Sequence, residues 1–305
     1  MPSRLLCNTL LALLFAGTAQ AQVVRRTGFM PQPAAVFEIV RQFYDYDHDL
    51  PLGTRTVQRW EDGRSLLEKI VFESTAHERI PGVLAVPKTR RAPYPCVLLL
   101  HGLNASKDFW WDHAVGADLA RRLLDAGTAV FAIDLRYHGE RAALLDYMAP
   151  MHLTFENTLH LRNRDMIVQS AIDARRALDV LRARADIDSA SLAVAGVSMG
   201  GMIATYLGAL EPGLAGLACA STPSHPQLAP ADHYSFAPRA HVPVLLLAGR
   251  TDWHTSPEDA RALLELFPHR DRRLALYDSG HALPAAWTAE AAAWLAERLA
   301  RREGR

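Results

Sequence analysis

The stretch VAGVSMGGM, residues 194–202, places a serine between two glycines directly after a small apolar run. Gly196, Ser198 and Gly200 stand at alternate positions, and the residues that follow have a helical pattern. A sharp turn from a strand into a helix lifts a serine hydroxyl out of the fold as a nucleophile. Glycine permits such a turn because backbones then approach closely. The plain alternative is a serine that caps the helix, so the rest of the chain has to decide.

Short apolar runs on both sides of this stretch predict a mostly parallel sheet of about eight strands. They lie at 96–100, 129–133, 192–197, 214–220, 243–249 and 273–279. Runs that are apolar on both faces are typical of parallel strands covered by helices. Helical patterns separate them at 117–127, 164–184, 257–267 and 285–302. This alternation predicts an α/β fold with helices on both faces and a site at the carboxyl ends of the strands.

The regular pattern begins near Ser65 with two alternating runs, at 66–74 and 79–87, which predict a leading hairpin. We therefore assign residues 65–305 to one catalytic domain. Residues 22–64 are less regular, with one helical pattern at 35–46, and we expect them to be an extension packed on the main domain.

Two residues downstream of Ser198 can activate it. A serine hydroxyl needs a base within hydrogen-bond reach and a group that orients the base. Asp252 follows the apolar run 243–249, and His281 follows the run 273–279. Asp and His are each common in loops, so neither is decisive alone. Together with Ser198 they occupy three strand ends in the order serine, acid, histidine, which predicts a catalytic triad.

Acyl transfer also needs donors aimed at the developing oxyanion. We expect one donor to be the backbone N–H of Met199, directly after the nucleophile. The second is expected to be the N–H of Leu103, in the loop HGLNAS that ends the run 96–100. We interpret His101 as a structural hydrogen-bonding residue.

Six segments carry a resemblance to a known family: RIPGVLAVPK (79–88), PYPCVLLLHGLNASKDFW (93–110), AIDLRYHGER (132–141), DIDSASLAVAGVSMGG (186–201), LLAGRTDWHTSPEDARALLELF (246–267) and YDSGHALP (277–284). From about residue 65 onward the chain resembles serine esterases of the α/β-hydrolase superfamily, in particular the dienelactone-hydrolase, acetyl-esterase and prolyl-oligopeptidase-related group. The resemblance implies an eight-stranded α/β-hydrolase fold and Ser–His–Asp hydrolysis without a metal or an organic cofactor. The chain departs from this group in two ways. It has Ser198 where dienelactone hydrolases usually carry a cysteine, and the residues before 65 are too few for the β-propeller of prolyl oligopeptidases.

The segment RAALLDYMAPMHLTFENTLHLRNR, residues 141–164, interrupts the strand–helix rhythm and predicts a small cap over the site. Four tryptophans beside the catalytic segments are candidates for lining an acyl or alcohol pocket, with core packing as the alternative for each. They are Trp110, Trp111, Trp253 and Trp287.

The first residues, MPSRLLCNTLLALLFAGTAQAQ, have the form of a secretory signal peptide. Arg4 precedes an apolar stretch at 5–17, and Ala19 and Ala21 give the small-x-small cleavage pattern. The apolar stretch is short for a membrane span of about 20 residues. We expect cleavage after Ala21, no stable membrane span afterwards, and a periplasmic or extracellular protein. An uncleaved anchor or a buried helix is the alternative.

Composition excludes some partners. Lys plus Arg and Asp plus Glu each total 33, which gives no electrostatic footprint for nucleic acid. After removal of the leader, Cys96 and Cys219 remain; both lie in apolar runs and are expected to be buried free thiols rather than a disulfide. No Cys/His spacing predicts a metal site, the group His225, His233 and His241 included.

These patterns favour an exported serine hydrolase that cleaves small or medium carboxylic esters. A peptidase or an acyltransferase with the same acyl-enzyme differs only in the acceptor, which the triad does not encode. A third interpretation is a non-catalytic binding protein with a hydrolase fold. The complete triad and oxyanion loop argue against it, because a protein without catalysis does not need them.

Overall fold

A computed structural model describes residues 30–75, 77–156, 159–224 and 231–303. The expected signal peptide at 1–21, with Cys7, lies outside these residues, as does His225. No helix in the described ranges is both long and apolar enough to span a membrane.

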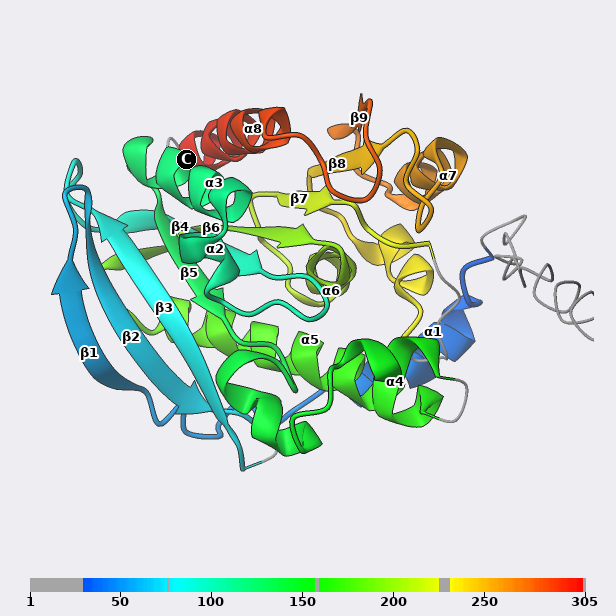
Figure 1. The fold of residues 1–305 in the computed structure, drawn as a ribbon, viewed down its shortest axis with the longest axis horizontal. Helices are drawn as coiled ribbons and strands as arrows, with labels where there is room; N and C mark the ends of the chain where they lie inside the picture. Colours follow the sequence, from blue (N-terminus) through cyan, green and yellow to red (C-terminus); the bar gives the residue numbers. More distant parts are fainter. Residues whose placement is uncertain (1–29, 76, 157–158, 225–230, 304–305) are drawn as a thin grey trace, which may run out of the picture.

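A nine-stranded sheet forms the centre of the molecule (Figure 1). Its strands are β1 (Arg55–Glu61), β2 (Ser65–Glu73), β3 (Arg79–Pro87), β4 (Tyr94–Leu100), β5 (Ala129–Ile133), β6 (Ile187–Val197), β7 (Leu217–Ala220), β8 (Val244–Gly249) and β9 (Arg272–Tyr277). The spatial order is β1-β2-β3-β5-β4-β6-β7-β8-β9. The strands from β5 to β9 in this order pair in parallel, whereas β1, β2, β3 and β5 pair antiparallel. The mostly parallel sheet and the leading hairpin are confirmed.

The sheet has one strand more than the eight that the sequence pattern locates. The additional strand, β1, lies in the segment 22–64 that the sequence pattern assigned to an extension. Its residues are exposed except for Thr56, so the strand lacks the alternation that marks a half-buried strand. The edge of the sheet therefore begins ten residues earlier than the pattern predicts, at residue 55 instead of 65.

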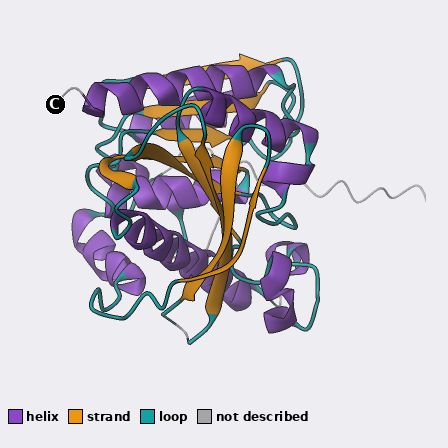
Figure 2. Ribbon diagram, turned by 90° about the vertical axis from the view of Figure 1, so that its left-hand side faces the viewer, coloured by secondary structure: helices purple, strands orange, loops and turns teal. Residues whose placement is uncertain are grey.

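Helices cover both faces of the sheet (Figure 2). They are α1 (Ala34–Arg41), α2 (Phe109–Asp112), α3 (Ala114–Asp125), α4 (Met151–Phe155), α5 (His160–Arg182), α6 (Met199–Leu210), α7 (Pro257–Leu266) and α8 (Ala286–Glu303), with short 3₁₀ helices η1 (Gln42–Tyr44), η2 (Gly139–Leu145), η3 (His233–Ser235) and η4 (Ala237–Arg239). A buried hydrophobic cluster lies on each face of the sheet. Helices α5 and α6 contribute to one cluster, and helices α3 and α8 contribute to the other.

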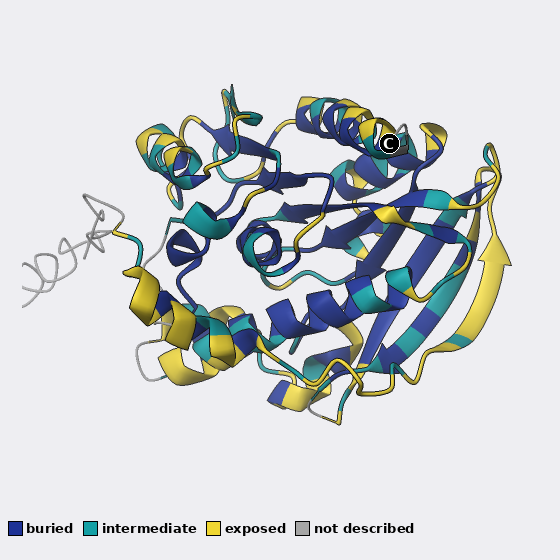
Figure 3. Cartoon of the chain, turned by 180° about the vertical axis from the view of Figure 1, so that it is seen from behind, coloured by how far each residue is buried: buried dark blue, intermediate teal, exposed yellow. Residues whose placement is uncertain are grey.

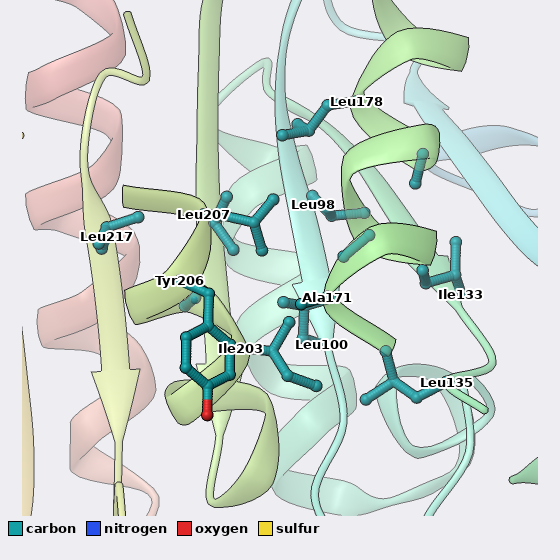
Figure 4. Close-up of a cluster of buried hydrophobic side chains, with 14 of the residues drawn as sticks. Leu98, Leu100, Ile133, Leu135, Ala171, Leu178, Ile203, Tyr206, Leu207 and Leu217 are labelled. Atoms are coloured by element: carbon teal, nitrogen blue, oxygen red, sulfur yellow. The ribbon is translucent and has the colours of Figure 1, made fainter. Parts of the chain in front are cut away.

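Strand β4 shows why the apolar runs are continuous. Leu98 and Leu100 face the cluster under α5 and α6, where Figure 4 shows them among Ala171, Ile203 and other side chains. Val97 and Leu99 face the opposite cluster under α3 and α8. Because successive residues of a strand point to opposite faces, a strand buried on both sides needs apolar residues at every position.

The residues before β1 lie against the main domain. Phe37 of α1 meets Phe236 with ring centroids 5.0 Å apart, and Tyr44 meets Tyr206 at 5.4 Å. Arg176 of α5 donates hydrogen bonds to the backbone carbonyls of Leu50 and Pro51. The outer side of α1 is exposed (Figure 3). This leading segment therefore covers part of the α5–α6 face.

The two cysteines of the described chain are buried free thiols, as predicted. Burial raises the pKa of Cys219 to about 12 and that of Cys96 further, so neither forms a thiolate readily near neutral pH.

Candidate active site

The three predicted triad residues follow the carboxyl ends of three strands. Ser198 follows β6 directly, Asp252 comes shortly after β8, and His281 comes shortly after β9. Nδ1 of His281 lies 2.9 Å from Oδ2 of Asp252, and Nε2 of the same ring lies 3.0 Å from Oγ of Ser198. The structure brings the predicted residues together as one hydrogen-bonded series.

Ser198 sits in a sharp strand-to-helix turn. Its backbone has φ 55° and ψ −117°, a conformation that L-residues rarely adopt. Its N–H donates to the carbonyl of Ala220 on β7, and its own carbonyl accepts from Gly201 in the first turn of α6. The turn is therefore tied to the sheet on one side and to the helix on the other, and it holds the hydroxyl above the strand ends.

The glycines around Ser198 are required by close backbone contacts. A Cβ on Gly196 would lie 2.2 Å from the carbonyl oxygen of Gly200, and a Cβ on Gly200 would lie 2.2 Å from that of Leu100. Neither distance is compatible with a side chain. The alternate glycines thus let α6 start against β6 and β4.

Buried groups hold the acid and the base. The Asp252 side chain is fully buried, and its second oxygen, Oδ1, accepts from the backbone N–H of His254 at 2.8 Å. The hydroxyl of Ser221 donates to the carbonyl of His281 at 2.7 Å. An imidazole whose Nδ1–H donates to Oδ2 of Asp252 presents Nε2 as an acceptor to the Ser198 hydroxyl.

The two expected oxyanion donors flank the serine. Met199 is the first residue of α6, where backbone N–H groups have no partner within the helix. A Cβ on Gly102 would lie 3.4 Å from Cβ of Ser198, so the loop that carries Leu103 lies against the nucleophile. The donor roles themselves stay predictions.

His101 anchors that loop from below. The side chain is fully buried; Nε2 accepts from the backbone N–H of Leu135 at 3.1 Å, and Nδ1 lies 2.8 Å from the carbonyl of Gly102. Because Nε2 accepts, Nδ1 carries the proton of a neutral ring. Burial lowers the pKa of His101 to about 4. This geometry agrees with the structural role expected for His101.

Two cavities open beside Ser198 and share Leu103, Ser198 and His281 in their walls. The first, which we call the cap cavity, has a volume of about 290 Å³ and is lined among others by Met151, Thr154, Phe155, Asn163, Trp253 and His254. The second, the α8 cavity, has a volume of about 310 Å³ and is lined among others by Ala105, Phe109, His113, Ser221, Leu283 and Trp287. A substrate bonded to Ser198 can therefore extend in two directions.

Comparison with known proteins shows which fold this geometry belongs to. A family model described as the alpha/beta hydrolase fold matches residues 95–232. Acetyl xylan esterase 1 from Thermoanaerobacterium sp. JW/SL YS485 superposes with a TM-score of 0.69 at 16% identity, over 88% of this chain and 95% of that one. The protein has the α/β-hydrolase fold.

Two further relatives of this α/β-hydrolase-fold protein are similar in structure or in sequence. An acetyl xylan esterase from Paenibacillus sp. R4 superposes with a TM-score of 0.66 at 17% identity, over 88% and 96% of the two chains. The putative hydrolase YtaP of Bacillus subtilis (strain 168) is 25% identical over 181 residues. That match covers 57% of this chain and 58% of the relative's own length.

Two of the four candidate pocket tryptophans lie elsewhere in this α/β-hydrolase-fold protein. Trp110 is fully buried in the cluster under α3 and α8, and Trp111 lines a separate surface cavity with Trp60 and Lys107. Successive residues of the short helix α2 point in different directions, so only its first residue, Phe109, reaches the α8 cavity. Trp253 and Trp287 line the cap cavity and the α8 cavity respectively.

The predicted cap segment does border the site. Helix α4 and the start of α5 supply Met151, Thr154, Phe155 and Asn163 to the cap cavity. The side chain of Asn104, in the oxyanion loop, accepts a hydrogen bond from the backbone N–H of Met151 at 3.0 Å. The cap and the oxyanion loop are therefore joined directly.

Sequence reasoning missed His254, although it adjoins the predicted acid. The centroid of its ring lies 4.4 Å from that of His281, and the Trp253 ring lies tilted against it at 3.4 Å. Its position next to Asp252 was the available signal. In the residues that the structure describes, no group of three His, Cys, Asp or Glu side chains is arranged to hold a metal ion.

Proposed function

We propose that this chain is a serine hydrolase that cleaves small or medium carboxylic esters through an acyl-enzyme on Ser198. The single observation that supports it most is the hydrogen-bonded series Asp252–His281–Ser198, whose histidine and serine line two cavities. The esterases among the similar structures favour esters over other acyl compounds.

The chemistry follows from the positions of the atoms. Nε2 of His281 takes the hydroxyl proton as Oγ of Ser198 attacks the ester carbonyl carbon. The tetrahedral oxyanion accepts hydrogen bonds from the N–H groups of Leu103 and Met199. His281 then gives its proton to the departing alcohol oxygen as the carbon–oxygen bond breaks. A water molecule then attacks the carbonyl carbon of the acyl-enzyme while Nε2 of His281 takes one of its protons. His281 returns this proton to Oγ of Ser198 as the bond between Oγ and the acyl carbon breaks and the carboxylic acid leaves.

Replacing Ser198 by Ala tests this mechanism, because the change removes the nucleophile and only one oxygen atom. In well-studied triads the loss of the serine lowers kcat by about 10⁶-fold. We therefore expect Ser198→Ala to lower kcat for esters by a factor of this size and to leave the circular-dichroism spectrum unchanged. Asp252→Asn is expected to cost about 10⁴-fold, because the imidazole then loses its orienting carboxylate. A Ser198 variant that keeps a tenth of the activity would contradict the assignment.

The same acyl-enzyme serves a peptidase or an acyltransferase. A panel of esters, peptide amides and thioesters, each with water and with added alcohols as acceptors, separates these functions. Hydrolysis of peptides without hydrolysis of esters would favour the peptidase. A folded protein that releases no product from any panel member would favour the non-catalytic binding protein.

We also propose that the protein is exported and that its mature chain begins at Gln22, because Ala19 and Ala21 form a cleavage pattern. Intact mass measured on protein from the periplasm or the medium is expected to match residues 22–305. Full-length protein confined to the cytoplasm would contradict export.

A further inference from the structure

The oxyanion loop is held at both ends by the short segment that follows β5. We propose, resting on the ester-hydrolase function above, that Asp134 is a positioning residue for ester hydrolysis. Its buried carboxylate holds Lys107, and Lys107 fixes the end of the loop that carries the expected donor Leu103. Asp134 lies outside the triad and lines neither cavity beside Ser198, so it acts on the reaction through the loop.

Two consecutive residues after β5 anchor the loop that follows β4. At the start of the loop, Nε2 of His101 accepts from the backbone N–H of Leu135 at 3.1 Å. Beyond its end, the backbone N–H of Lys107 donates to Oδ1 of Asp134 at 2.8 Å. Strands β4 and β5 pair in parallel, so their carboxyl ends meet at the same edge of the sheet. Leu103 lies between the two anchors.

The Asp134 carboxylate is fully buried, and each of its oxygens accepts a hydrogen bond. Oδ2 accepts from Nζ of Lys107 at 3.2 Å and from the backbone N–H of Glu140 at 3.0 Å. The Lys107 side chain is only 4% exposed, and its Nζ also lies 2.7 Å from Oε1 of Glu140. A Cβ on Gly139 would lie 2.3 Å from Oδ1 of Asp134, so the chain folds tightly against the carboxylate. The carboxylate therefore has a fixed position, to which Lys107 is bound by both its backbone and its side chain.

This buried pair fixes a geometry that the chemistry needs. Taking two charges out of water costs free energy that their attraction only partly returns, so stability alone does not account for the pair. The backbone N–H of Ala105 donates to the carbonyl of Gly102 at 3.2 Å, which closes a turn around Leu103. Because the turn is short and anchored at both ends, a shift of Lys107 moves the N–H of Leu103. An oxyanion donor acts only when it lies about 3 Å from the developing charge.

Two variants and a matched control test this role. Asp134→Asn keeps the size of the side chain, removes the charge and places an amide NH₂ group among donors. Lys107→Met removes the ammonium group and keeps the backbone hydrogen bond to Asp134. Glu211→Gln is the control, because Glu211 is also buried and ion-paired, with two arginines, but lies at the end of α6 away from Ser198.

The probes are p-nitrophenyl butyrate, an alkyl trifluoromethyl ketone and the corresponding trifluoromethyl alcohol. Oγ of Ser198 adds to the ketone carbon, its proton goes to Nε2 of His281, and the carbonyl oxygen becomes an oxyanion. The alcohol has a similar shape but forms neither the bond nor the oxyanion. The ratio of the two inhibition constants therefore measures stabilisation of the oxyanion separately from binding of the alkyl chain.

With Asp134→Asn, we expect kcat for p-nitrophenyl butyrate to fall about 10- to 100-fold, approaching the loss of one oxyanion donor, while KM changes by less than about threefold. Affinity for the ketone is expected to fall by a similar factor, and affinity for the alcohol to stay the same. Lys107→Met is expected to shift kcat and ketone affinity in the same direction by about three- to tenfold. Glu211→Gln is expected to lower the thermal midpoint and to leave kcat and the ratio of inhibition constants unchanged.

Circular dichroism and the thermal midpoint identify the variants that fold, and Lys107→Met provides the test if Asp134→Asn does not fold. An unchanged ratio of inhibition constants in a folded variant would overturn the positioning role. An equal change of this ratio in Glu211→Gln would overturn it as well. If the folded, unmodified protein neither releases p-nitrophenol nor binds the ketone more tightly than the alcohol, the ester-hydrolase function fails instead. The two failures are therefore distinguishable.

Discussion

At the scale of single residues, strain and burial are concentrated where the chemistry is expected. Ser198 adopts a backbone conformation that the close contacts of Gly196 and Gly200 hold in place. Asp252 is buried, and each of its oxygens has a partner. Oδ1 accepts a hydrogen bond from the backbone N–H of His254, and Oδ2 lies against Nδ1 of His281. Such an arrangement costs folding free energy at these positions, and the packed sheet beneath compensates for it.

Buried histidines make stability depend on pH. Burial lowers the pKa of His101 to about 4 and that of His138 to about 3, both from an ordinary value of 6.5. The unfolded chain therefore binds protons at these residues at a higher pH than the folded one. The stabilisation is complete above pH 6.5 and is lost as the pH falls toward 4. For His101 we expect a loss of roughly 3 kcal/mol in the free energy of unfolding.

Urea denaturation at pH 7 and at pH 4.5 measures this effect. His101→Gln keeps a side-chain acceptor and cannot be protonated, so the pH dependence is expected to become shallower. His241→Gln, at an exposed position, serves as the control and is expected to leave the dependence unchanged. If the free energy of unfolding depends equally on pH in the unmodified protein and in both variants, the buried His101 ring is not the source of this dependence.

At the scale of elements, the cap segment is anchored more deeply than its sequence suggests. Leu145 and Leu153 belong to the core, and Arg141 is buried at the start of the segment. Its guanidinium donates to Asp173 at 2.7 Å and to Glu78 at 2.8 Å. The segment 141–164 thus joins the sheet domain through its own buried residues, and only its middle part borders the cavity.

Arg141→Ala is expected to lower the free energy of unfolding by about 3–5 kcal/mol, because it leaves the fully buried Asp173 carboxylate without its cation. Thermal or urea denaturation measures the change. Arg164→Ala removes a solvent-accessible pair with Asp165 in the same segment and is expected to cost less than about 1 kcal/mol. Similar losses in both variants would show that burial of the Arg141 pair does not matter.

The elements also show what the sequence could predict. Strands β4, β6 and β8 were readable because burial on both faces leaves continuous apolar runs. Helix α7 was readable from the helical pattern at 257–267, and in the structure Ser256 begins it with a capping box to Asp259. Strand β1 was not readable, because a strand exposed along nearly all its length has no hydrophobic pattern. The direction of Trp110 depends on how α2 packs, which a single sequence does not encode.

At the scale of the whole molecule, the expected acyl preference follows from the size of the two cavities beside Ser198. The cavities have volumes of about 290 and 310 Å³, so a growing acyl chain soon fills either of them. We expect acetyl to butyryl esters to have the highest kcat/KM, with a decline beyond about six to eight carbons once added methylenes find no apolar contact. A p-nitrophenyl ester series from acetate to palmitate measures this, and a steady rise to palmitate would contradict it.

The open sheet also has a consequence for self-association. Its outermost strands are β1 and β9, and an unpaired edge is a template on which a strand of a second molecule can add. In β1, Arg55, Arg59 and Glu61 stand on the edge strand, and the register shifts between Thr56 and Gln58. Charge and an irregular edge both oppose continued pairing between copies. The same exposed strand that leaves no trace in the hydrophobic pattern thus helps to keep the sheet from growing beyond one molecule.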